Sequence, residues 1–195
     1  MRIWFDVLTP KQLLFFEPMI KRIKKNHTVL CTSRDYDQVT HLAKIRGVKL
    51  IIIGKHGGSG RNDKLNASLH RAKSLSFKIK EFSPDMTISF CSPEAARVSY
   101  GLNIDHICFS DSPHATAVMR LVIPLVQKLL IPWIIPKKEF TKFGIDSKNI
   151  INYKAIDAAV IAKRKISKNN KNRSKKKHSI FFRARRGFFK RCICN

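Results

Sequence analysis

The chain has 195 residues, with 39 Lys and Arg against 13 Asp and Glu, and a formal net charge of +26. This length is enough for one complete α/β domain and too short for two of ordinary size. Residues 163–195 hold 14 Lys or Arg and no Asp or Glu, which leaves residues 1–162 with a net charge of +12. The sequence therefore predicts one moderately basic domain over residues 1–161 and a strongly basic tail over residues 162–195.

The amino terminus and the apolar segments indicate a cytoplasmic protein without a transmembrane segment. The chain opens directly on a strand-like run and lacks the basic and long apolar regions of a signal peptide. Its longest apolar tract, residues 117–135, is interrupted by Arg120, Gln127, Lys128 and several prolines, so it does not read as a membrane span.

The five cysteines indicate a reduced protein and no zinc site. Cys31, Cys91 and Cys108 fall in predicted strands, where thiols behave as small buried apolar groups. Cys192 and Cys194 lie close together at the carboxyl terminus, without a second pair at zinc-binding spacing. We expect no metal and no cofactor.

Apolar runs and helical periodicity alternate along residues 1–161. Strands are expected at residues 3–8, 27–32, 49–53, 86–91, 107–110, 128–135 and 150–153. Helices are expected at residues 10–25, 35–46, 63–82, 93–101 and 113–123, with a short helical turn at 140–145. This alternation predicts an α/β, Rossmann-like, doubly wound parallel sheet. In the usual strand order, the first and fourth strands flank the switch point where ligands bind.

Two details of the helices are specific enough to be checked. Pro18 should kink the first helix, because it removes one N–H group and crowds the carbonyl of Leu14. In the third helix, capped by Asn62 or Asp63, an apolar stripe is expected to face the core: Leu65, Leu69, Ala72, Leu75, Ile79 and Phe82.

Three strands are followed by a hydroxyl residue, a proline and an ionisable residue: Thr9-Pro10-Lys11, Ser92-Pro93-Glu94 and Ser112-Pro113-His114. A hydroxyl cap and a proline at the first helical position both favour the start of a helix. Each tripeptide can therefore be a helix cap and nothing more. Three of them at one edge of a sheet, with Asp111 directly before the last, also predict a ligand site there.

The glycine-rich loop at residues 54–60 is a second candidate for ligand binding. Its glycines allow backbone N–H groups to converge on an anion, and Lys55, His56 and Arg61 add positive charge. The spacing fits neither a Walker loop nor the dinucleotide fingerprint. The loop is interpreted either as a phosphate cradle, with His56, Gly57 and Gly58 as its binding residues, or as a plain flexible connection.

The basic tail has three interpretations. Residues 163–179 lack apolar periodicity and are expected to be disordered, and the following Phe pairs alternate with arginines. Such a segment could bind RNA or another polyanion, or lie on an acidic membrane surface. It could also be the product of translation in a wrong reading frame, which the abrupt change in composition favours.

Several long motifs resemble one prokaryotic family, catalogued as domain of unknown function 354: MRIWFDVLTPKQLLFFEPMIKRIKK, GKHGG, ISFCSPEAARVSYGL, HICFSDSPHATAVMRL and LLIPWIIPKKEFTKFGI. The resemblance covers roughly residues 1–161. That family is similar in turn to the two-domain enzymes of the GT-B fold, including the non-hydrolysing UDP-N-acetylglucosamine 2-epimerases. Thr9, Pro10 and Pro18 match the layout of their first helix.

The resemblance implies the N-terminal GT-B-type domain of a sugar-nucleotide-dependent glycosyltransferase or epimerase-like enzyme. In that fold a second domain holds most of the nucleotide, so a chain with only the first domain is expected to be truncated and inactive alone. A sugar nucleotide or another phosphorylated ligand is the implied partner. The alternatives are a non-catalytic binding module with a basic tail for RNA or another polyanion, and a non-functional fragment with an exposed apolar face.

Three residues are candidates for acid–base catalysis. They are His114, Asp111 and Glu94, with His114 preferred as the proton carrier because imidazole titrates near neutrality. Glu94 is expected to stay ionised at a helix N-terminus and to bind a sugar hydroxyl. The remaining candidates for ligand binding are Asp6, Thr9, Pro10, Lys11, His56, Gly57, Gly58, Ser92, Arg97 and Ser112.

Overall fold

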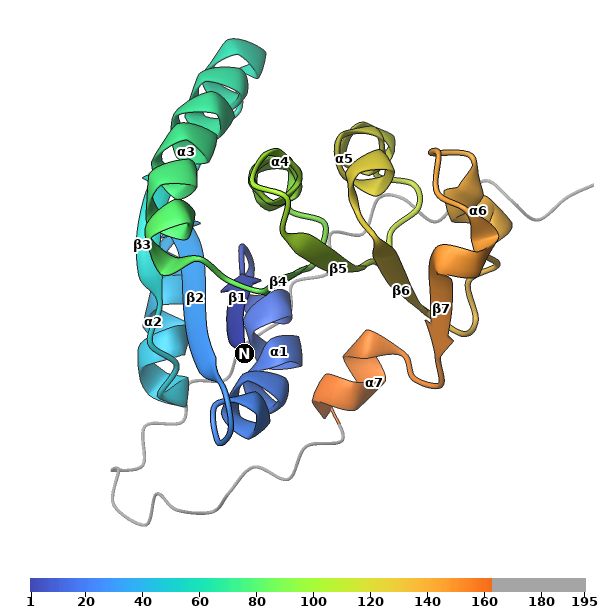
Figure 1. Ribbon diagram of the computed structural model, residues 1–195, viewed down its shortest axis with the longest axis horizontal. Helices are drawn as coiled ribbons and strands as arrows, with labels where there is room; N and C mark the ends of the chain where they lie inside the picture. Colours follow the sequence, from blue (N-terminus) through green and yellow to red (C-terminus); the bar gives the residue numbers. More distant parts are fainter. Residues whose placement is uncertain (163–195) are drawn as a thin grey trace, which may run out of the picture. The chain divides into compact units, whose positions relative to one another are not determined.

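The computed structural model describes residues 1–162, and the descriptions below concern these residues. They form one seven-stranded parallel sheet in the order β3-β2-β1-β4-β5-β6-β7 (Figure 1). The strands are β1 (Arg2–Asp6), β2 (Thr28–Asp35), β3 (Ile51–Lys55), β4 (Met86–Ser89), β5 (Asp105–Phe109), β6 (Lys128–Pro132) and β7 (Ile150–Tyr153). The helices are α1 (Pro10–Ile23), α2 (Asp37–Arg46), α3 (Arg61–Phe82), α4 (Pro93–Gly101), α5 (Thr116–Val122), α6 (Lys138–Thr141) and α7 (Asp157–Ala162).

The strand order confirms the predicted doubly wound, Rossmann-like sheet. Strand β1 pairs in parallel with β2 on one side and with β4 on the other. The chain therefore reverses its direction of winding between these two strands, as expected. The loops that follow β1 and β4 meet at this switch point, which is the usual position of a ligand site in an open α/β sheet.

Helices cover both faces of the sheet (Figure 1), with α1 and α2 on one face and α3, α4 and α5 on the other. Side chains of β1 alternate between these faces, as the pleat of a strand requires. Ile3 and Phe5 pack in a core with Leu13 and Phe16 of α1. Trp4 packs on the other face with helices α3 and α4. Asp6 follows Trp4 by two residues, so this buried carboxylate faces α3.

Several element boundaries differ from the predicted ones. Strand β4 ends at Ser89, and Cys91 lies beyond it in a left-handed conformation with φ 49°. Helix α5 begins at Thr116, so Ser112, Pro113 and His114 form a turn and not the first turn of the helix. The prediction that Pro113 opens a helix is wrong. The chain first makes a turn, closed by a hydrogen bond from the N–H of Ala115 to the carbonyl of Ser112 (3.1 Å).

Helix α3 differs from the prediction in its cap and in its first half. Gly60 precedes it and no side chain caps it, so neither Asn62 nor Asp63 has the predicted role. Leu75 and Ile79 are buried as expected, whereas Leu65 and Leu69 are more than half exposed. The amino-terminal half of α3, which contains Leu65 and Leu69, extends beyond the edge of the sheet in Figure 1.

Three other expectations can be compared with the described residues. Helix α1 runs from Pro10 to Ile23 as one continuous helix that contains Pro18. Cys31, Cys91 and Cys108 are buried free thiols, whereas Cys192 and Cys194 lie outside the described residues, as does the predicted basic tail from residue 163 onward. Within residues 1–162, no helix is long and apolar enough to cross a membrane.

Candidate functional site

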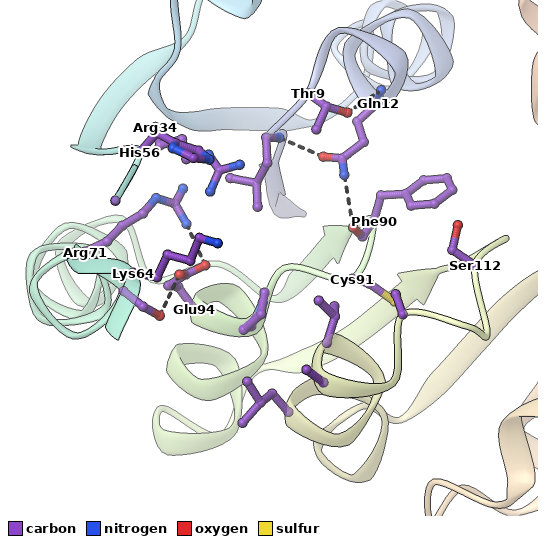
Figure 2. Close-up of a pocket in the computed structure, with 18 of the residues that line it drawn as sticks. Thr9, Gln12, Arg34, His56, Lys64, Arg71, Phe90, Cys91, Glu94 and Ser112 are labelled. Atoms are coloured by element: carbon purple, nitrogen blue, oxygen red, sulfur yellow. Dashed lines mark hydrogen bonds and ion pairs between the residues drawn. The ribbon is translucent and has the colours of Figure 1, made fainter. Parts of the chain in front are cut away.

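A pocket of about 700 Å³ opens at the carboxyl ends of the strands (Figure 2). Its walls come from the loops after β1, β3, β4 and β5 and from one side of helices α3 and α5. All strands of a parallel sheet end at the same edge, so loops that are far apart in sequence meet here. Seven of the predicted site residues line this pocket: Thr9, Lys11, His56, Gly57, Glu94, Asp111 and Ser112.

The floor of the pocket rests on a buried ion pair between Asp6 and Arg71, which are fully buried and 2% exposed, respectively. Arg71 Nη2 lies 2.6 Å from Asp6 Oδ1, and Arg71 Nη1 lies 3.1 Å from Asp6 Oδ2. Arg71 Nε also donates to the carbonyl of Ile53 (3.0 Å). Two parallel N–H···O bonds of this kind fix the orientation of both side chains.

Two hydroxyls complete the hydrogen bonding of the Asp6 carboxylate. Thr32 Oγ1 donates to Asp6 Oδ1 and Ser92 Oγ donates to Asp6 Oδ2, each at 2.6 Å. Burial by itself raises the pKa of Asp6, but the charge of Arg71 and the hydrogen bonds from Arg71, Ser92 and Thr32 outweigh it, and the pKa is lowered. Asp6 is therefore an ionised structural anchor beneath the pocket and does not itself line it.

Glu94 connects this anchor to the pocket surface. Its Oε1 accepts a hydrogen bond from Ser68 Oγ (2.7 Å), and its Oε2 lies 3.4 Å from Arg71 Nη1. Ser92 caps helix α4 by accepting from the N–H of Ala95 (3.2 Å). The Glu94 carboxylate is thus held at the N-terminus of α4 and is 11% exposed toward the pocket.

A second charged cluster lies at the end of β5. Lys11 forms a close ion pair with Asp111, and its Nζ lies 3.6 Å from Asp157 Oδ2 of helix α7. Asp111 also accepts from Ser112 Oγ (2.9 Å). Burial raises the pKa of Asp111, but the hydrogen bonds from Lys11 and Ser112 and the charge of Lys11 outweigh it, so its pKa is lowered. Asp111 is therefore ionised at neutral pH.

Gln12 joins the two loops at the switch point. Its Oε1 accepts from the N–H of Leu8 (2.7 Å), and its Nε2 donates to the carbonyl of Phe90 (3.2 Å), as Figure 2 shows. One amide side chain thus satisfies backbone groups of the loop after β1 and the loop after β4. The two loops are held at a fixed separation, which defines the width of the pocket between them.

Other predicted site residues lie outside the pocket lining. Asp6 and Ser92 are buried beneath the pocket, as described above. Pro10, Gly58, Arg97 and His114 do not line it either, and Arg97 and His114 are exposed. The structure therefore brings Glu94 and Asp111 to the pocket and leaves His114 on an outer turn.

The sequence patterns did not indicate several polar residues of this site, among them Gln12, Arg34, Lys64, Ser68, Arg71 and Asp157. A signal existed for Arg71, because it continues the buried positions Leu75 and Ile79 at four-residue spacing. A charged residue in line with a buried stripe predicts a buried partner. No comparable local signal identifies Asp157, which reaches Lys11 only because α7 packs against α1.

Among the described residues, no group of His, Cys, Asp or Glu side chains is arranged to hold a metal ion. The acidic groups of the site instead have cationic or hydroxyl partners: Arg71, Ser68 and Ser92 for Glu94, and Lys11 and Ser112 for Asp111. The arrangement can accept hydrogen bonds from ligand hydroxyls and can exchange protons at carboxylates.

The family model described as "Protein of unknown function (DUF354)" matches residues 1–179. A relative from Methanocaldococcus jannaschii, "Uncharacterized protein MJ0665", is 30% identical over 152 residues, which are 77% of this chain and 44% of the relative. This chain thus spans less than half of the relative's length. The family match runs past Ala162 into the basic segment.

Solved structures with the same fold include two UDP-GlcNAc 2-epimerases. The enzyme from Neisseria meningitidis, bound to UDP-GlcNAc, is 16% identical with a TM-score of 0.62, over 78% of this chain and 45% of that one. The enzyme from Methanocaldococcus jannaschii is 14% identical with the same TM-score and coverage. MurG from Acinetobacter baumannii is 10% identical with a TM-score of 0.59, over 78% of this chain and 44% of that one. At these identities the likeness establishes the fold, which is that of one half of each protein.

Proposed function

The chain belongs to the DUF354 family, and from that premise we propose that it is the N-terminal domain of a sugar-nucleotide-dependent glycosyltransferase or epimerase-like enzyme. The observation that carries the proposal is the pocket at the switch point, into which Glu94 and Asp111 face from two neighbouring loops. The fold shared with UDP-GlcNAc 2-epimerases and MurG supports it. The chain spans less than half of those proteins, so the complete enzyme would need a further domain.

The ligand part assigned to this domain is the sugar or the acceptor hydroxyl. Carboxylates are acceptor-only groups when ionised, and sugar hydroxyls are donors, so Glu94 and Asp111 can each orient one hydroxyl. Glu94 keeps its orientation through Ser68 and Arg71, while Asp111 keeps it through Lys11 and Ser112. Such fixed carboxylates hold a reacting hydroxyl without further reorganisation.

Proton transfer is assigned to Asp111, with Lys11 as its charge partner. An ionised carboxylate can accept a proton from a sugar hydroxyl or from a sugar carbon, and the ammonium group beside it can stabilise developing negative charge. His114, the residue preferred from the sequence, lies on an exposed turn outside the pocket lining. Its predicted role therefore has no support from its position.

The proposal can be tested by saturation-transfer NMR of UDP-N-acetylglucosamine with the full chain. We expect signals from the sugar protons in the wild-type protein and a large loss of these signals in Asp111→Asn and Glu94→Gln. Glu139→Gln is the matched control, because Glu139 lies on α6, outside the pocket lining, and pairs with Lys142 on the surface. Variants at Asp111 and Glu94 that keep the wild-type signals would contradict the proposal.

A basic polyanion-binding module remains the second candidate, because residues 163–195 carry 14 Lys or Arg without one acidic residue. Electrostatic binding to RNA releases counterions, so its affinity falls steeply as salt concentration rises. A pocket for a sugar nucleotide should be much less sensitive to salt. Filter binding of a single-stranded RNA to the full chain between 50 and 200 mM salt (roughly the range over which several phosphate contacts lose orders of magnitude) distinguishes the two.

The coding DNA offers an independent check on the basic segment. If another reading frame downstream encodes a second α/β domain, the predicted wrong-frame origin of the segment is supported and polyanion binding loses its basis. The absence of such a domain from every downstream frame would favour a genuine basic segment.

A further inference from the structure

Arg34 presents an unpartnered guanidinium group to one end of the pocket. Among the described residues, none accepts a hydrogen bond from its side chain, and its Nε is fully buried. A guanidinium carries five N–H donors in a planar fork. Partial burial lowers the pKa of Arg34, because removal from water disfavours the charged form. A buried N–H donor such as Arg34 Nε is costly without an acceptor, and a bound oxyanion would remove that cost.

A β-bulge places Arg34 in this position. Ser33 pairs with Ile52, but Asp35 pairs with Lys55, so Arg34 alone faces the two residues Ile53 and Gly54 of β3. Bulges change the direction of a side chain and are frequent beside active sites. The carbonyl of Ile53, at this irregularity, is the one that accepts from Arg71. The bulge thus positions the Arg34 side chain on β2 and the carbonyl of Ile53, which accepts from Arg71, on β3.

Other cationic and donor groups line the same end of the pocket. Lys55 is the last residue of β3, His56 follows it, and Lys64 lies in the first turn of α3. Figure 2 shows Arg34, His56 and Lys64 at this end, together with Arg71. His56 Nδ1 accepts a hydrogen bond from the N–H of Gly58 (3.1 Å), so in the neutral ring the proton is on Nε2. His56 is therefore a donor through Nε2.

The protein balances the positive charge at this end only in part: the Glu94 and Asp6 carboxylates attract Arg34 electrostatically, but neither is in ion-pair contact with it. Arg71 is neutralised by Asp6 and Glu94. By contrast, within residues 1–162 no carboxylate forms an ion pair with Arg34, Lys55 or Lys64. A phosphate monoester, with a charge of about −1.5 to −2 at neutral pH, complements this excess better than a single carboxylate does.

We propose that Arg34, His56 and Lys64 form a subsite for a phosphate group of the ligand, at the end of the pocket opposite Asp111. This subsite deepens the proposed function, and the identity of the ligand rests on that function. The ligand would carry a phosphate group at a fixed distance from the carboxylates that bind its hydroxyls. The Arg34 fork binds two phosphate oxygens, and Lys64 and the His56 Nε2–H bind the third.

The subsite can be tested with inorganic phosphate as the probe, titrated into the full chain by calorimetry in 150 mM NaCl (a concentration at which the Debye length is about 8 Å, so contacts with exposed basic residues are screened). We expect one saturable site in the wild-type chain and a loss of affinity of about tenfold or more in Arg34→Gln. Arg22→Gln is the matched control, because Arg22 is exposed in the last turn of α1 and does not line the pocket. Its affinity should equal that of the wild type.

Lys64→Gln provides a second variant on an exposed position that should not disturb folding. It is expected to weaken phosphate binding several-fold, roughly as expected for loss of one charged contact. The proposal is overturned if wild-type binding is not saturable, or if both Arg34→Gln and Lys64→Gln bind phosphate as the wild type does.

Competition experiments identify the source of the phosphate. Displacement of phosphate by UDP-N-acetylglucosamine assigns the subsite to the diphosphate of a donor, whereas displacement only by glucose 6-phosphate assigns it to a phosphorylated acceptor. Displacement by neither would contradict the subsite. Failure of the proposed function looks different: Asp111→Asn and Glu94→Gln would leave UDP-N-acetylglucosamine contacts unchanged while phosphate still bound at Arg34.

Discussion

Asp6 at the end of β1 and Arg71 in the middle of α3 are 65 residues apart in sequence and form a buried two-point ion pair, with N–O distances of 2.6 and 3.1 Å. The pair fixes α3 against the carboxyl edge of the central strand. Because Arg71 also reaches Glu94, it sets the position of a pocket carboxylate as well. Stability and site geometry therefore depend on the same guanidinium.

Removal of Arg71 should be strongly destabilising. In Arg71→Met the Asp6 carboxylate stays buried without its cation, and the expected loss is about 3–5 kcal/mol in the free energy of unfolding. Urea denaturation followed by circular dichroism measures it. The exposed pair of Lys78 and Glu81 is the control, where Lys78→Met should cost less than about 1 kcal/mol. Equal costs for the two substitutions would show that the buried pair is not a structural anchor.

A double substitution tests the same pair more directly. Asp6→Asn combined with Arg71→Met removes both charges, so it should be less destabilising than the sum of the two single substitutions. Simple additivity in this double-mutant cycle would argue that the two side chains do not interact.

Gly54 should tolerate alanine poorly for two separate reasons. Its φ is 73°, and a Cβ there would lie 2.9 Å from Arg71 Cγ. At Gly47, φ is 65° and an added Cβ would meet nothing within 4 Å, so alanine there would cause backbone strain without a steric clash. Gly47→Ala is expected to cost about 1 kcal/mol, and Gly54→Ala clearly more. Thermal denaturation of both variants gives the comparison, and a smaller effect at Gly54 would rule out the close approach of Arg71.

The two serine and threonine caps should differ in their contribution to stability. Thr9 accepts from the N–H of Gln12 (3.3 Å), whereas Ser92 caps α4 and also donates to Asp6 (2.6 Å). Thr9→Ala should cost about 1 kcal/mol, the usual value of a cap. Ser92→Ala should cost about 2–3 kcal/mol, since a hydrogen bond to a buried charge is lost as well. Chemical denaturation of the two variants in parallel measures the difference; no excess at Ser92 would mean that its bond to Asp6 adds nothing.

His106 on β5 should make the protein less stable between pH 6.5 and pH 4. The ring is fully buried, its Nε2 is 2.9 Å from Ser89 Oγ, and its Nδ1 has no partner among the described residues. Burial lowers its pKa from 6.5 to about 4. In this window the unfolded chain binds the proton and the folded one does not, so stability falls as pH falls, by on the order of 3 kcal/mol in total.

Replacement of His106 isolates this effect. The stability of His106→Gln, measured by urea denaturation from pH 7 to pH 4, should fall less steeply than that of the wild type. His41→Gln, at an exposed position of α2, should keep the wild-type slope. Burial is the main cause that raises the pKa of Asp157, so this residue makes stability rise as pH falls. All three proteins contain Asp157, and its effect therefore cancels in the comparison. An unchanged slope in His106→Gln would assign the acid sensitivity to other groups.

Most of the architecture followed from local patterns. Thr9 and Ser92, each before a proline, were predicted as caps and accept the expected backbone hydrogen bonds. The same pattern at Ser112 failed, because a cap requires the chain to enter the helix immediately, and here it makes a turn first. His114 consequently lies on that turn, outside the pocket lining.

The alternation of strands and helices predicted a parallel sheet and the edge where Thr9, Glu94 and Asp111 gather, while the switch point was expected from the usual strand order of such sheets. The strands and helices themselves depend on contacts within a few residues, which leave a periodic trace in the chain. Only the tertiary structure decided that Asp6 has Arg71 as its partner and that a bulge turns Arg34 into the pocket. Pairing of buried charges depends on which surfaces the sheet order and the position of α3 bring together, and no local periodicity encodes that.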